Sequence, residues 1–401
     1  MVPARRLRLL YFLYYASVGT MLPYFAVYLR GLGFDGDAIG TVQMLPALLS
    51  PLVALGWAGF ADRHGVPTLA LRRAALVAAA ASLLLPFART PLAVGAVLLA
   101  MALGDRALVP VLDANTVEWS RARPTVVYAR VRLFGSLGFS ALALAGGAAL
   151  AARGDRPGDV LVPAVVAACL AAFAAVALTL PAAPGHAEAR PAPRELLSLL
   201  RHRPLVVLLG ACALHWMACA PYHLFFGVLV RDRALPSAVA GIGMTAGVAA
   251  EILALLLFPR LGPRFSTRAL LVAAFLGSAL RWLLLSQATS AAAIVALQLL
   301  HGLTFGLFWA TAIHALGTLV PARLRATGQA LFSAVVFGIG NSLGYRLSGA
   351  AYDWHGSAAP LFAWAAGVEL VALAVGLALL GRAAPASVSG GPATSAPRGA
   401  P

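Results

Sequence analysis

Long uninterrupted apolar runs recur along the whole chain, separated by short polar segments that carry Arg, Pro and Gly. A membrane-spanning helix needs roughly 20 consecutive apolar residues, whereas a strand of an outer-membrane barrel alternates with a period of two. The pattern therefore predicts an all-α membrane protein with twelve transmembrane helices. They are expected near residues 7–29, 38–60, 69–88, 91–115, 129–151, 160–180, 204–230, 237–258, 268–287, 290–314, 327–350 and 359–381.

The longest polar connector, residues 181–203, divides these helices into two sets of six. It contains four prolines and four arginines, a composition typical of a linker. We expect a six-helix bundle over residues 1–180, a cytoplasmic linker over 181–203 and a second six-helix bundle over 204–381. The final segment, 382–401, is rich in Ala, Pro, Ser and Gly, which predicts a disordered cytoplasmic tail.

The composition excludes a soluble globule. Apolar residues make up 61% of the 401 positions and charged residues only 11%, whereas soluble proteins carry about 25% charged residues. The three cysteines (Cys169, Cys212 and Cys219) lie inside apolar runs and have neither the spacing of a disulfide framework nor that of a metal site. No cofactor and no metal are expected.

The net charge of +16 comes from arginine alone, because the chain contains no lysine. With the N-terminus inside, 21 of the 30 arginines fall at cytoplasmic helix ends and six at outer ends. This bias predicts that both termini are cytoplasmic, and it explains the charge without a nucleic-acid partner. The first apolar run continues to Leu29, which is too long for a signal peptide.

The two halves resemble each other at corresponding positions. Arg30 and Gly40 stand ten residues apart between the first two predicted helices, and Arg231 and Gly241 repeat this spacing 201 residues later. Two similar six-helix halves with a site between them, near the middle of the bilayer, are typical of secondary transporters.

A motif between the second and third predicted helices points to a family. The stretch 59–65, with Gly59, Asp62, Arg63 and Gly65, resembles the loop signature of the major facilitator superfamily, although Val66, Pro67 and Thr68 replace the usual basic pair. We expect these four residues to form a cytoplasmic gating loop, in which glycine permits a tight turn and Asp62 accepts hydrogen bonds across the gate.

A narrower resemblance covers nearly the whole chain. Residues 128–139 and 325–330 are similar to signatures of the phenylpropionate-permease-like group and, more distantly, of lactose-permease-like sugar/proton symporters. The resemblance implies two pseudo-symmetric six-helix bundles in the bacterial inner (plasma) membrane.

Charged residues at membrane depth are costly, so they are expected to pair and to line a cavity. Glu251, Arg281 and His301 occupy positions that resemble the carboxylate, Arg and His of proton coupling in the sugar symporters. Thr304 stands where that pattern has an acidic proton carrier, so Glu251 would carry the proton alone, or coupling is absent. The alternatives are a static Glu251–Arg281 ion pair and a histidine that only packs.

A second predicted pair is Asp113 with Arg132. By resemblance to the sugar symporters, the two would hold substrate groups, with Ser136 one helical turn from Arg132 on the same face. The alternative is a salt bridge at the cytoplasmic end. Asp105 and Arg106 are adjacent, so we expect no simple pairing between them. They form either a polar part of the cavity or a clamp between helices.

Further candidates for substrate contacts are polar and aromatic residues on helix stripes: His215, Tyr222, Tyr15, Gln43 and Asn341. Such stripes also occur as packing or lipid-interface belts.

The chain lacks a phosphate-binding loop, and no lysine is present to complete one. We therefore predict a monomeric secondary active transporter, in which protons drive symport of a small organic solute. The first expectation for the solute is an aromatic or other weak carboxylic acid, because two arginines would make the cavity positive. The alternatives are a sugar or nucleoside carried by uniport or symport, an integral-membrane enzyme, and a transporter-like sensor.

Overall fold

The computed structural model describes residues 3–183 and 199–380, which are almost entirely helical. Residues 184–198 of the predicted linker and the predicted tail lie outside this part. One group of helices comprises α1 (Pro3–Gly31), α2 (Gly36–His64), α3 (Pro67–Ser82), α4 (Pro91–Ala122), α5 (Tyr128–Ala152) and α6 (Leu161–Thr179). A 3₁₀ turn, η1 (Leu85–Phe87), follows α3.

The second group begins with α8 (Arg203–Asp232), α9 (Ser237–Leu261) and α10 (Thr267–Gln287). A continuous helical run follows, formed by α11 (Ala291–Leu297), η2 (Gln298–Leu300), His301, the π-helix η3 (Gly302–Leu307) and α12 (Phe308–Leu319). After η4 (Ala322–Leu324), a second run contains α13 (Arg325–Phe332), the π-helix η5 (Ser333–Gly340) and α14 (Asn341–His355), and α15 (Ala359–Leu380) follows.

Eleven helices in the described ranges are long and apolar enough to cross a membrane. The remaining predicted span, 327–350, corresponds to the continuous run from Arg325 to His355, which is more polar and is interrupted by η5. The largest error in the predicted ends is in α4, which runs to Ala122 rather than to residue 115. Asp113 therefore lies well inside α4 instead of near its end.

The helix ends follow local rules. The side chains of Thr90, Ser266 and Ser290 each accept a hydrogen bond from a backbone N–H in the first turn of the following helix. Gly65 has a φ of +62°, which confirms that it makes the tight turn between α2 and α3. The expectation for Gly59 was wrong in this respect, because Gly59 lies inside α2.

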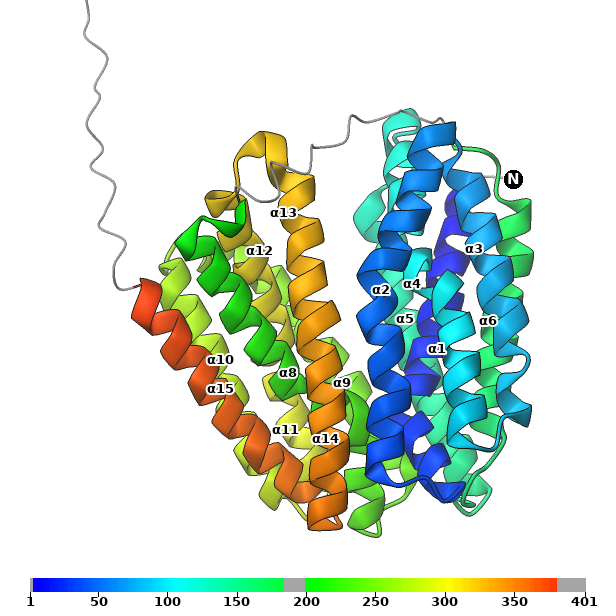
Figure 1. The fold of residues 1–401 in the computed structure, drawn as a ribbon, viewed down its shortest axis with the longest axis vertical. Coiled ribbons are helices and arrows are strands. Elements are labelled where there is room, and N and C mark those ends of the chain that lie inside the picture. Colours follow the sequence, from blue (N-terminus) through cyan, green and yellow to red (C-terminus); the bar gives the residue numbers. More distant parts are fainter. Residues whose placement is uncertain (1–2, 184–198, 381–401) are drawn as a thin grey trace, which may run out of the picture.

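The two groups form bundles that meet at one end of the molecule and diverge at the other (Figure 1). The end where they meet, called the closed end below, contains the turns at residues 32–35, 153–160, 233–236 and 356–358. The other end, near the N-terminus, is called the open end. Small residues bring backbones together at the closed end. A Cβ on Gly349 of α14 would meet the backbone of Gly36 in α2, and one on Gly241 of α9 would meet that of Ala143 in α5.

The internal repeat is visible in the hydrogen bonds of the closed end. Arg30 donates from Nη1 to the carbonyl oxygen of Phe34 at 2.8 Å, and Arg231 donates from Nη1 to that of Leu235 at 2.9 Å. In both bundles, the arginine near the helix end thus stabilises the following turn by binding a carbonyl oxygen four residues later.

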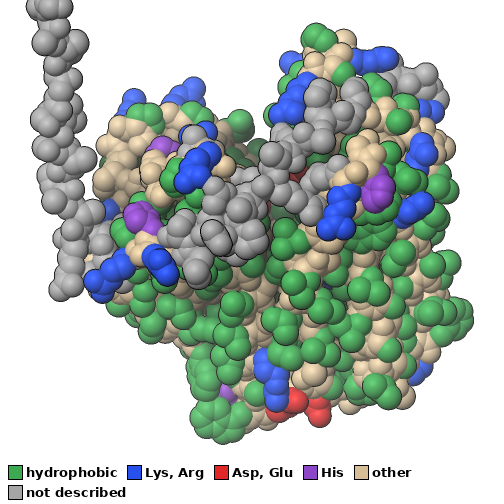
Figure 2. Space-filling view, turned by 45° about the horizontal axis from the view of Figure 1, so that its top comes forward, with side chains coloured by type: hydrophobic (Ala, Val, Ile, Leu, Met, Phe, Trp, Pro, Cys, Tyr) green, Lys and Arg blue, Asp and Glu red, His purple; other side chains and the backbone are tan. Residues whose placement is uncertain are grey.

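The outer surface of the bundles is rich in exposed apolar side chains, as a lipid-facing surface requires. In Figure 2 these side chains cover the flanks of both lobes, and basic side chains gather around the open end, beside the hollow between the lobes.

Candidate functional site

A cavity of about 460 Å³ lies between the two bundles. One wall is formed by α1 and α5, and the other by α8, α9, the run from His301 to Trp309, and the run through η5 and α14. Seven of the predicted site residues line it: Tyr15, Arg132, Ser136, Tyr222, Glu251, His301 and Asn341. Residues far apart in sequence and from both halves thus share one polar chamber.

Arg132 is the basic group on the first wall. Its Nη2 donates to the Tyr15 hydroxyl, and its guanidinium carbon lies 4.5 Å from the centre of the Tyr15 ring. Asp113 does not line the cavity. It accepts hydrogen bonds from Tyr11 and Tyr128, and its nearest carboxylate oxygen is 4.0 Å from Nε of Arg132. Asp113 therefore supports Arg132 from behind without occupying its hydrogen-bonding fork.

The second wall carries a series of three polar side chains rather than a simple ion pair. Nε2 of His301 lies 3.7 Å from a carboxylate oxygen of Glu251, and Nδ1 of His301 lies 3.0 Å from Nη1 of Arg281. Arginine can only donate, so Nδ1 accepts and the ring proton stands on Nε2, facing Glu251. The alternative of a direct Glu251–Arg281 ion pair does not hold, because His301 stands between the two.

Arg281 is fully buried behind the cavity wall. Its Nη2 donates to Oε1 of Gln298 at 2.6 Å, and its guanidinium carbon lies 4.4 Å from the ring centres of both Tyr222 and Trp282. These contacts hold the guanidinium in one orientation without a directly bound carboxylate. Arg281 thus positions His301 and does not itself line the chamber.

A smaller pocket of about 130 Å³ adjoins the cavity and shares His223 and Tyr345 with it. Gln43, Asp105 and Arg106 line this pocket. We expected no simple pairing between Asp105 and Arg106. Nε of Arg106 lies 3.8 Å from a carboxylate oxygen of Asp105, which is an ion-pair contact without a hydrogen bond. Of the two alternatives, the pocket favours a polar extension of the cavity.

Aromatic rings form much of the cavity's second wall. Trp216 lies edge-on to Phe337 at 4.7 Å between ring centres, and Trp309 stacks on Phe337 at 5.7 Å. His301 stacks on Phe305 at 4.9 Å. The π-helices η3 and η5 carry Phe305 and Phe337, and such segments in a helix are frequent at functional sites.

His215 does not line the cavity. The expectation for it was wrong because its ring is fully buried within the second bundle, where Nδ1 lies 2.9 Å from Oε2 of Glu369. Sequence reasoning missed Glu369, and also Gln298. The signal for Glu369 was available, since it is the one charged residue in the apolar run 359–380.

The predicted gating loop lies at the open end, where Arg63 and Gly65 are exposed. The side chain of Asp62 is outside the described part of the structure. His64 contacts the carbonyl oxygen of Phe60 at 2.9 Å through Nδ1, and Arg73 covers the Phe60 ring. These contacts stay within the first bundle.

Residues 4–364 match the model of the MFS_1 like family. The chain belongs to this family. Two relatives align with most of it. Maltose permease of Geobacillus stearothermophilus is 28% identical over 335 residues, which cover 83% of each chain. The "Probable 3-phenylpropionic acid transporter" of Escherichia coli (strain K12) is 27% identical over 358 residues, 88% of this chain and 92% of the relative.

Solved structures of other transporters share the architecture. A mutant of the nucleoside transporter NupG superposes with a TM-score of 0.84 at 18% identity, covering 94% of this chain and 100% of that one. An inward-facing, unoccupied bacterial homolog of the human lysosomal transporter Spinster gives a TM-score of 0.67 at 15% identity, with 94% of each chain covered. At these identities the likeness shows the fold.

The predicted major facilitator fold is thereby confirmed, as is its resemblance to the phenylpropionate-permease-like group. This member of the MFS_1 like family is a multi-pass membrane transporter and not an enzyme, because its relatives and structural neighbours are transporters.

Proposed function

We propose that the protein imports a small organic acid together with a proton, by alternating access of the central cavity. The observation that carries this proposal is the distribution of charge across the chamber. Arg132 stands on the wall of the first bundle, and the Glu251–His301 pair stands on the wall of the second. A bound anion would therefore touch both bundles.

The first wall suits a carboxylate. Arginine offers a planar fork of donors that matches a carboxylate in a bidentate way. Asp113 approaches Arg132 only to 4.0 Å, so the fork retains donors for a ligand. The rings of Trp216, Phe305 and Trp309 line the same chamber and would accept an aromatic body. An aromatic carboxylic acid combines both features, and one relative is named for 3-phenylpropionic acid.

Glu251 supplies the coupling. It faces a neutral ring N–H of His301, and its side chain is 29% exposed to the chamber. A second carboxylate entering the chamber would repel an ionised Glu251, and the repulsion is relieved when Glu251 binds a proton. Solute and proton would thus bind together. We propose Glu251 and His301 as the proton-coupling residues, with Arg281 as their positioning residue.

We propose that the predicted substrate-binding residues that line the cavity contact the solute. Arg132, Tyr15, Ser136, Tyr222 and Asn341 lie where they could contact the solute. Gln43 would act in the adjoining pocket, and Asp113 through Arg132. His215 is not among the proposed substrate contacts, because it is buried within the second bundle.

The structure corresponds to a state open on one side. By the distribution of arginine, the open end is cytoplasmic, so both termini and the gating loop with Gly59, Asp62, Arg63 and Gly65 lie inside. We propose the bacterial inner membrane as the location. We propose a monomer as the working unit, because the two bundles of one chain form the whole cavity between them.

A sugar is the second candidate solute. The relative named maltose permease has the higher identity of the two, and aromatic faces beside the Asn341 amide also suit a sugar ring.

The test is uptake of labelled 3-phenylpropionate and maltose into proteoliposomes with an imposed pH gradient, acidic outside. We expect 3-phenylpropionate to accumulate above its external concentration and to be released by a protonophore. Protein-free liposomes are the essential control, because a weak acid also crosses lipid unaided. Protein-dependent uptake that ignores the gradient would refute proton coupling, and gradient-driven uptake of maltose alone would replace the acid with the sugar.

A further inference from the structure

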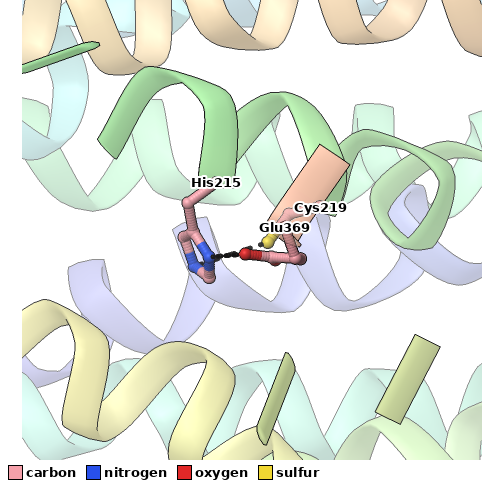
Figure 3. Close-up of side chains that lie close together, drawn as sticks. All are labelled: His215, Cys219 and Glu369. Atoms are coloured by element: carbon pink, nitrogen blue, oxygen red, sulfur yellow. Dashed lines mark hydrogen bonds and ion pairs between the residues drawn. The ribbon is translucent and has the colours of Figure 1, made fainter. Parts of the chain in front are cut away.

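A second ionisable pair lies inside the second bundle, separate from the cavity. Glu369 of α15 and His215 of α8 are both fully buried. Nδ1 of His215 lies 2.9 Å from Oε2 of Glu369, and Nε1 of Trp282 donates to Oε1 of Glu369 at 3.1 Å. Figure 3 shows the imidazole and the carboxylate pointing toward each other between their helices, with Cys219 beside them. The proposed transport cycle does not use this pair.

The partners of His215 define how many protons the pair holds. Nε2 lies 3.0 Å from the backbone carbonyl oxygen of Thr304, which can only accept, so Nε2 carries a hydrogen. The contact between Nδ1 and Glu369 then contains a single proton, which stands either on the ring or on the carboxyl group. In both cases the pair is neutral as a whole, as its complete burial requires.

Loss of that one proton would break the contact. A bare carboxylate would then face the lone pair of Nδ1 without water to separate them, and one buried charge would remain uncompensated. The nearest other titratable or charged groups are Cys219, whose Sγ is 3.7 Å from Nε2 of His215, and Arg281 and His223, which interact electrostatically with the pair. Proton occupancy therefore controls the link between α8 and α15.

With Cys219, the pair also resembles a metal site. Ligand-type atoms of His215, Cys219 and Glu369 lie within 4.8 Å of one another, as they could around a metal ion. Both ring nitrogens of His215 already have hydrogen-bond partners, however. In the described part of the chain, a metal ion would have to displace one of these hydrogen bonds to bind His215.

Two contacts connect this pair with the cavity. Thr304 belongs to the π-helix η3, and its carbonyl accepts from His215, while His301 and Phe305 on either side of Thr304 line the cavity. Trp282, which donates to Glu369, follows Arg281, the partner of His301. A change at Glu369 would thus act toward His301 along two routes, through the backbone of η3 and through the neighbour of Arg281.

We propose that Glu369 and His215 form a second proton site of the transport cycle, linked to the cavity through Thr304 and Trp282. The proposal rests on the proposed proton coupling and extends it, because it adds a site that solvent in the cavity does not reach. For release of the proton, α8 and α15 must move apart within the second bundle during the change of access, and the proton is rebound when they pack together again.

The test separates charge from shape at Glu369. Glu369→Gln keeps the size and a hydrogen bond to His215 but cannot release a proton, whereas Glu369→Asp keeps the acid and shortens the side chain. Each variant is reconstituted in proteoliposomes. Solute-driven proton influx is followed with a pH-sensitive dye, and counterflow of labelled 3-phenylpropionate is measured without a gradient. Glu118→Gln, at the open end of α4, is the matched carboxylate-to-amide control.

We expect Glu369→Gln to show less solute-driven proton influx than wild type, because the Glu251 site still carries its proton, and to keep counterflow. Glu369→Asp should retain both at a reduced rate, and Glu118→Gln should behave as wild type. Solute-driven proton influx in Glu369→Gln equal to that of wild type would overturn the proposal. So would loss of counterflow or of the thermal unfolding transition in both Glu369 variants, since the pair would then be structural. Wild-type protein without any solute-driven proton influx would instead refute the proposed symport, and with it the second site.

Discussion

Arg346 of α14 donates through Nη1 to Oδ1 of Asp37 in α2, and this ion pair joins the two bundles at the closed end. Next to it, the carboxylate of Asp353 accepts the backbone N–H groups of Gly36 at 2.6 Å and of Asp37 at 2.7 Å. All these contacts run between α2 and α14. They must break if the closed end opens, so they stabilise the observed state over its opposite.

The ion pair makes a modest contribution to this balance. Both side chains are partly exposed, at 42% and 47%, and exposed pairs contribute about 1 kcal/mol at most, which is roughly a fivefold change in a two-state population. We therefore predict that Arg346→Gln makes the cavity more accessible from the closed end, by up to about fivefold. The measurement is the labelling rate of Val18→Cys, in the cavity wall, by an impermeant maleimide.

Arg121→Gln is the control for this prediction. It removes an ion pair with Glu118 that lies within α4 and does not join the bundles. Equal labelling rates in wild type, Arg121→Gln and Arg346→Gln would show that the ion pair does not hold the closed end.

Close backbone packing should matter more than the ion pair. A Cβ at Gly349 would meet the backbone of Gly36, which cannot move aside as a flexible side chain can. We predict that Gly349→Val prevents closure at this end, abolishes transport and raises the labelling of Val18→Cys from the closed side. Gly210→Val is the control, because a Cβ at Gly210 meets no atom within 4 Å. Wild-type transport in Gly349→Val would contradict this role of the interface.

Arg132 should account for much of the binding of an acid. Hydrogen bonds to charged groups contribute about 1.5–3 kcal/mol, which corresponds to roughly 10- to 150-fold in Kd. Arg132→Ala is therefore expected to weaken binding of 3-phenylpropionate by that factor, as measured by titration calorimetry in detergent. The exposed Arg130, two residues earlier on α5, provides the control variant Arg130→Ala. Unchanged affinity in Arg132→Ala would remove the basis for an anionic solute.

Stability should depend on pH through a pair in the turn between α5 and α6. Arg153 donates to both carboxylate oxygens of Asp159, at 2.6 and 3.1 Å, and these hydrogen bonds hold the pKa of Asp159 below its usual value. Because the pKa is lowered on folding, the stabilisation is present above the unfolded value of about 3.9 and is lost as the pH falls through the lower folded value.

We predict that Asp159→Asn lowers the thermal midpoint at neutral pH and that its difference from wild type disappears in strong acid. Arg153→Gln should give the same pattern, and the double variant should add little to either single one. Thermal unfolding in detergent over a pH series checks this. A difference that stays constant into strong acid would mean that the pair does not titrate as described.

The helices and the family could be predicted from the sequence because they depend on local properties. Apolar run length predicted twelve spans. Eleven of the corresponding helices are long and apolar enough to cross a membrane, and the run around Asn341 is more polar. The predicted span ended at residue 115, whereas α4 continues to Ala122. The polar residues near residue 115 have partners inside the bundle: Tyr11 donates to Asp113, and Thr68 donates to Asn115.

The site was harder to predict because it depends on which way each helix face turns. Arg132, Glu251 and His301 were found from motifs and charge. His215 was misplaced since a helical stripe alone cannot distinguish a cavity wall from the interior of a bundle. Its partner Glu369 lies 154 residues away in sequence, and no spacing rule connects them.

The most direct test of the central claim compares two transport modes in the Glu251→Gln variant. Proteoliposomes containing wild-type protein or the variant are assayed for gradient-driven accumulation of 3-phenylpropionate and for its counterflow without a gradient, with protein-free liposomes subtracted. We predict that wild type performs both and that Glu251→Gln loses accumulation but keeps counterflow. Equal accumulation by the two proteins would contradict the account, because the proton would then not be carried at the cavity wall.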